Sequence, residues 1–138
     1  MTVYLDTSSL LKLYLDERDS EEVKMLVTGS VVASSIVAYA EARAGLARAR
    51  RLGRLTDSEV AELRGSFEAR WMNVRLVDVT DSVVRLAGDC AEKYALRGFD
   101  AIHLASALIL ARELGEPLSF SAADDRLMDA AVSEGLIV

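Results

Sequence analysis

Four acidic residues stand where a folded chain normally places apolar or uncharged side chains. Asp6 directly follows the first apolar run of the chain, and Asp124 follows a later one. On helices of ordinary geometry, Glu41 falls on or beside an apolar stripe, and Asp100 is in line with the apolar side of another helix. Buried carboxylates without partners are costly, so each of these acids needs a partner.

A bound divalent cation would explain all four acids at once, because gathered carboxylates repel one another and few cations accompany them. Oxygen ligands favour Mg²⁺ or Mn²⁺ over zinc, and the chain has only one histidine and one cysteine. Such an ion lowers the pKa of an attacking water and neutralises charge on a phosphodiester. Each acid alone has an ordinary alternative: a helix cap, a surface residue or a first-turn acid.

Short apolar strands alternate with helices along the chain, and no two-residue hairpin joins two strands. We expect strands at 3–5, 31–33, 74–79 and 118–120, with a fifth at 136–138, and a long helix from Ser35 to Leu52. This order predicts an α/β fold with parallel strands. Ligands bind beyond the carboxyl ends of such strands, where Asp6 and Asp124 meet if the first and fourth strands are neighbours.

The composition fits one domain over residues 1–138, with 51% hydrophobic residues and a net charge of −6. That charge argues against a general electrostatic coat for nucleic acid, although four of the acids belong to the proposed site. No apolar run approaches the roughly 20 residues that span a bilayer, so we expect no membrane partner. The lone Cys90 and the absence of a signal-like N-terminus favour the cytoplasm.

Four segments carry the four acids, and together they resemble the PIN-domain ribonucleases, particularly the VapC-type toxins of toxin–antitoxin modules. The resemblance implies a PIN-like domain with a five-stranded parallel sheet of order 3-2-1-4-5, flanked by helices. It also implies Mg²⁺-dependent or Mn²⁺-dependent endoribonuclease activity leaving a 5′-phosphate, a homodimer and inhibition by a cognate antitoxin protein. The segments are Val3–Ser8, Ser34–Glu41, Phe99–Ala107 and Phe120–Leu127.

The chain departs from the family pattern at Ala122, where the family often has a hydroxyl residue two positions before the fourth acid. Ser8 is expected to orient a site water or carboxylate, or else to cap a helix. His103 lies three residues after Asp100, but a lone histidine on a helix is more often structural than catalytic. Arg48 falls on the same side of its helix as Glu41 and is our candidate RNA-phosphate contact; a solvated helix face is the alternative.

Two further alternatives remain open from the sequence. An amphipathic stripe is either core, a dimer contact or a groove for an antitoxin helix. The whole chain is either a metal-dependent endoribonuclease toxin or a catalytically silent PIN-fold module in an antitoxin–DNA regulatory complex. A phosphoacceptor receiver domain fits poorly, because no lysine follows Lys93. The stripe comprises Val60, Leu63, Phe67 and Trp71.

Overall fold

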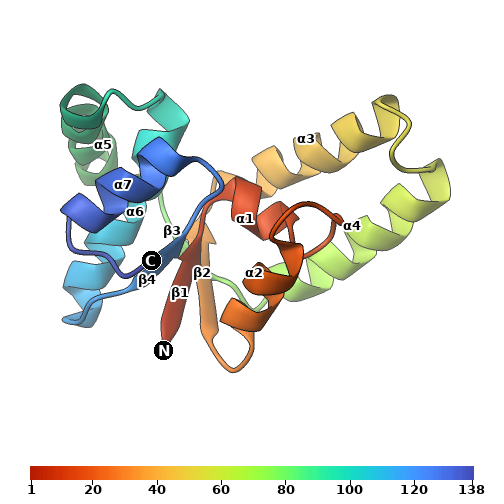
Figure 1. The fold of residues 1–138 in the computed structure, drawn as a ribbon, viewed down its shortest axis with the longest axis horizontal. Helices are drawn as coiled ribbons and strands as arrows, with labels where there is room; N and C mark the ends of the chain where they lie inside the picture. The colour runs from red at the N-terminus through yellow and green to blue at the C-terminus, as the bar shows by residue number, and fades with distance from the viewer.

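Four short parallel strands form the centre of the computed structural model, which describes residues 1–138 (Figure 1). Their order is β3-β2-β1-β4, and all three pairings are parallel, as the sequence predicted. The first and fourth strands are therefore neighbours, with Leu5 paired to Ser121. The strands are β1 (Thr2–Leu5), β2 (Val31–Ser35), β3 (Arg75–Val77) and β4 (Ser119–Ser121).

Seven helices surround this sheet, with α5, α6 and α7 to one side and α1 to α4 to the other (Figure 1). The helices α3 and α4 form a hairpin that extends away from the sheet (Figure 1). The bounds are α1 (Thr7–Leu11), α2 (Ser20–Val27), α3 (Ala38–Arg51), α4 (Asp57–Trp71), α5 (Asp81–Tyr94), α6 (Gly98–Leu114) and α7 (Asp125–Ser133).

Strand β1 is buried on both faces, because its alternating side chains enter two different cores. Tyr4 joins the larger core, which includes residues of α5, α6 and α7. Val3 and Leu5 join a second core with residues of α2, α3 and α4. This double burial fixes the end of β1, and with it the backbone that carries Asp6.

The predicted fifth strand is wrong, and the sheet has four strands. The chain after α7 makes only an isolated parallel bridge between Ile137 and Ser119. Leu136 is buried, but Ile137 and Val138 are exposed, so this segment has too little apolar surface facing the core to hold a longer ladder.

The predicted start of the long helix at Ser35 is also wrong. Ser34 and Ser35 end strand β2, and α3 begins at Ala38. Ser34 is fully buried and donates a hydrogen bond of 2.7 Å to the carbonyl of Leu5, so its hydroxyl ties two strands together instead of capping a helix.

No single helix is long and apolar enough to cross a membrane. Only α5 and α6 taken together have the length and apolar composition of a span, and they meet at a bend of 117°.

Candidate active site

The four predicted acids line one cleft of about 450 Å³ at the carboxyl ends of the strands. Each lies at the start of a helix. Asp6 and Asp124 are the N-cap residues of α1 and α7, and Glu41 and Asp100 lie in the first turns of α3 and α6. Helices that follow parallel strands begin at this edge, so their positive N-terminal ends partly offset the charge of the acids.

Asp6 is buried, with only 5% of its surface exposed. Its Oδ1 accepts hydrogen bonds from the Ser8 hydroxyl at 2.6 Å and the Ser9 amide at 2.9 Å. Burial nevertheless raises the pKa of Asp6, and the nearby Asp100 carboxylate also raises it. Its Oδ2 is left without a protein partner and is available to a ligand in the cleft.

Ser8 connects the first acid to the loop that carries the fourth. Besides donating to Asp6, its hydroxyl accepts a hydrogen bond of 3.0 Å from the Ala123 amide. Ser9 and Ser121 add a second link of 2.8 Å between the same segments. The loop is therefore held although Ala122 lacks the hydroxyl typical of the family.

Asp100 and Asp124 both line the cleft, where their negative charges repel each other. Partial burial raises the pKa of Asp100, and the charge of Asp124 raises it further. The Oδ1 of Asp124 accepts a hydrogen bond of 3.0 Å from the Leu127 amide, as expected for an N-cap. Its Oδ2 makes no hydrogen bond within the protein.

A buried network behind the cleft holds Glu41. Its Oε1 accepts a hydrogen bond of 2.7 Å from the Thr7 hydroxyl and lies 3.0 Å from His103 Nε2. On the far side of the imidazole, Nδ1 lies 2.9 Å from the Tyr4 hydroxyl. Partial burial of Glu41 acts to raise its pKa, but the hydrogen bonds from His103 and Thr7 outweigh this, and the pKa is lowered.

The network defines one tautomer of His103. An ionised Glu41 only accepts hydrogen bonds, so Nε2 carries a hydrogen, and in the tautomer with that single hydrogen Nδ1 accepts from the Tyr4 hydroxyl. Burial raises the pKa of Tyr4 far above its usual range, so this hydroxyl keeps its proton to donate. His103 therefore has the structural role that the sequence favoured, but it acts directly on a site carboxylate.

The structure does not bring every predicted residue to the cleft. Arg48 is exposed, lies further along α3 than Glu41, and is not among the lining residues. The sequence reasoning missed Arg97 and Phe99, which do line the cleft, and the network residues Thr7 and Tyr4. Thr7 directly follows Asp6, and Phe99 directly precedes Asp100. This adjacency is the one feature of the sequence that could have identified them as site residues.

The donor atoms suit a hard divalent cation, because the cleft offers carboxylate oxygens and no cysteine. No three acidic, histidine or cysteine side chains are grouped as a ready metal site, so binding would require side chains to turn toward a shared centre. The unpartnered oxygens of Asp6, Asp100 and Asp124 leave them free to do so.

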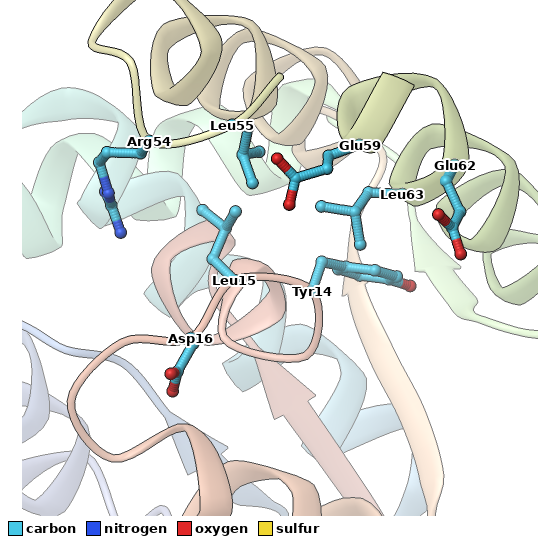
Figure 2. A pocket seen from close by; sticks show the side chains of 8 residues that line it. All are labelled: Tyr14, Leu15, Asp16, Arg54, Leu55, Glu59, Glu62 and Leu63. Atoms are coloured by element: carbon cyan, nitrogen blue, oxygen red, sulfur yellow. The ribbon is translucent and has the colours of Figure 1, made fainter. Parts of the chain in front are cut away.

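A second cleft of about 450 Å³ lies between the segment that follows α1 and the α3–α4 hairpin (Figure 2). It contains none of the four site acids. Leu63 of the amphipathic stripe reaches it, whereas Phe67 is buried and packs its ring against Tyr14 and Trp71. The centre of the stripe is therefore core.

Comparisons with known proteins agree with this geometry. Residues 3–131 match the family model of the PIN domain. Ribonuclease VapC49 of Mycobacterium tuberculosis is 42% identical over 135 residues, which cover 96% of this chain and 91% of the relative. Ribonuclease VapC46 of the same organism is 34% identical over 137 residues, which cover 99% of this chain and 95% of the relative.

Solved structures show the same fold. The crystal structure of Mycobacterium tuberculosis VapC20, a sarcin-ricin loop cleaving toxin, has a TM-score of 0.65 at 19% identity, covering 98% of this chain and 96% of that one. FitAcB from Neisseria gonorrhoeae has a TM-score of 0.66 at 17% identity, covering 99% of this chain and 95% of that one. The family model, the relatives and the acid-lined cleft together show that the chain belongs to the PIN domain family and is of the VapC type.

Proposed function

We propose that this protein is an endoribonuclease toxin that hydrolyses RNA phosphodiester bonds with the help of Mg²⁺ or Mn²⁺. The observation that carries the proposal is the convergence of Asp6, Glu41, Asp100 and Asp124 on one cleft. Support comes from the VapC relatives, which are named ribonucleases. We further propose a cytoplasmic homodimer whose activity a cognate antitoxin protein neutralises, as the family resemblance implies.

When bound, the cation would supply a water of lowered pKa and charge neutralisation at the phosphorus oxygens. Asp6, Asp100 and Asp124 would hold it through their unpartnered oxygens. Glu41 remains ionised at neutral pH because its pKa is lowered, so its Oε2 can accept a hydrogen bond from a water in the cleft. The Thr7 and His103 contacts fix the direction of that carboxylate.

Ser8 keeps the two halves of the site in register, because its hydroxyl binds Asp6 and the Ala123 amide together. The N-terminal ends of α3 and α6, which no side chain caps, favour a negatively charged phosphate despite the acids that line the cleft. Positioning and electrostatics of this kind supply most of the catalysis in phosphoryl chemistry.

Induced expression in a bacterial host tests the proposal. We expect the wild-type chain to arrest growth and to generate RNA fragments with 5′-phosphate ends, whereas Asp100→Asn does neither. Asp129→Asn on the exposed surface of α7 serves as the matched control and should behave as wild type. Equal growth arrest by wild type and Asp100→Asn would contradict a nuclease mechanism.

A further inference from the structure

One aromatic side chain differs from all the others in its exposure to solvent. Phe99 is 58% exposed, whereas every other phenylalanine, tyrosine and tryptophan is buried or partly buried. It lies in the first turn of α6, next to Asp100, and lines the acid cleft. Other large apolar side chains are exposed as well, but Phe99 is the one among them that lines the acid cleft, so its place at the site and not its exposure alone points to a role.

A cation accompanies the ring. Arg97 lies two residues earlier, is exposed, and forms no ion pair within the protein. It lines both the acid cleft and an adjoining cleft of about 430 Å³, which also contains Arg126. Gly98 between them has no side chain, and its Cα faces open space. Both side chains line the acid cleft, so a ligand bound there can reach the ring and the guanidinium together.

This pairing matches the two parts of a single-stranded nucleotide, its base and its phosphate. Unstacked bases pack on exposed aromatic rings, and guanidinium groups bind phosphate oxygens. The cleft beside them is the place where the scissile phosphate would lie. We propose that Phe99 and Arg97 form a binding subsite for one unpaired RNA nucleotide adjacent to the cleaved bond, with Phe99 stacking on the base and Arg97 contacting a phosphate.

The subsite rests on the proposed nuclease function and adds to it a preference for unpaired RNA. A ring stacks on any base, so Phe99 selects for strand accessibility more than for sequence. A duplex keeps its bases stacked on one another and cannot offer a face to the ring without unpairing.

The test measures binding of a fluorescently labelled uridine oligonucleotide by anisotropy, in an Asp6→Asn background that prevents cleavage. We expect Phe99→Ala to weaken binding by about fivefold or more, and Phe99→Tyr to restore it. Val132→Ala, at a similarly exposed apolar position on α7, is the control and should bind as the background protein does. Arg97→Gln should reduce the slope of log affinity against log salt by roughly 0.7.

An oligonucleotide with abasic positions separates stacking from other effects. Phe99→Ala should no longer weaken binding to it, because the base is absent. Equal loss on both ligands, or no loss on either, overturns the subsite. A changed molecular mass of Phe99→Ala in light scattering, with unchanged RNA binding, would assign the ring to a protein interface instead.

The proposed function fails separately. If the wild-type protein neither binds nor cleaves RNA, both ideas are wrong. If it cleaves RNA and Phe99→Ala binds and cleaves equally well, the nuclease stands and the subsite does not.

Discussion

The hydrogen-bond network behind Glu41 gives a prediction that spectroscopy can test at one atom. Tyr4→Phe removes only the hydroxyl that lies 2.9 Å from His103 Nδ1. The ring nitrogen is then left buried without a partner, because His103 is 2% exposed. Leaving a buried polar group unsatisfied costs about 1–3 kcal/mol, so we expect the free energy of unfolding to fall by that amount.

The same change should loosen the site carboxylate. Without the Tyr4 hydroxyl, the imidazole keeps its hydrogen on Nε2, toward the ionised Glu41, but it loses the contact that fixes the ring on its other side. Residues that orient metal-site ligands typically change activity or metal affinity by about 10- to 100-fold. We expect RNA cleavage by Tyr4→Phe to fall within that range through kcat, with little change in KM.

The chain contains a single histidine, so nitrogen NMR of selectively labelled protein reports His103 alone. The wild-type spectrum should show hydrogen on Nε2 and none on Nδ1, and in Tyr4→Phe the Nδ1 resonance should shift because that nitrogen loses its hydrogen-bond partner while Nε2 keeps its hydrogen. Leu13→Met, a partly buried position in the second core, is a control for small packing changes. A wild-type ring with hydrogen on Nδ1 would refute the reasoning.

Three further variants test the raised pKa of Asp6, the hydrogen bonds of Ser8 and the burial of Phe67. Asp6→Asn should stabilise the metal-free protein at neutral pH and lose that advantage at low pH. The pKa of Asp6 is raised in the fold, so ionisation of this carboxyl destabilises the folded protein as pH rises. Thermal unfolding of both proteins measured against pH tests this. Ser8→Ala should lower the free energy of unfolding in urea by about 0.5–1.5 kcal/mol, since it removes the hydrogen bonds that Ser8 makes with Asp6 and with the exposed Ala123 amide, and it should also slow cleavage. Phe67→Ala should cost about 3–5 kcal/mol in the same assay, because the ring is fully buried in the second core; a loss below 1 kcal/mol would contradict that packing.

Much of the site could be predicted from the sequence, because the positions of its acids follow from strand order and helix periodicity. Asp6 and Asp124 follow strands that are neighbours in the sheet, and Asp100 lies on the first turn of a helix whose apolar side was clear from its periodicity. Glu41 was placed correctly although the start of its helix was not, since a shift of that boundary does not change the relative positions of residues within α3.

What the sequence did not reveal depends on contacts between distant segments. Tyr4 and His103 are separated by 99 positions, and no local pattern joins them. Ser34 looks like a helix cap, but its hydroxyl binds a neighbouring strand. The last residues have the composition of a strand, yet only Leu136 finds a place in the core.

The most direct test of the central claim is cleavage of total cellular RNA by purified protein, with Mg²⁺ or Mn²⁺ present. Wild type, Asp6→Asn, Glu41→Gln, Asp100→Asn and Asp124→Asn are compared with the surface control Asp129→Asn. We predict discrete fragments from wild type and the control, suppression by a chelator, and a loss of roughly 100-fold or more in the site variants. Cleavage by Asp6→Asn and Asp100→Asn at the wild-type rate, or cleavage that a chelator leaves unchanged, would contradict the account.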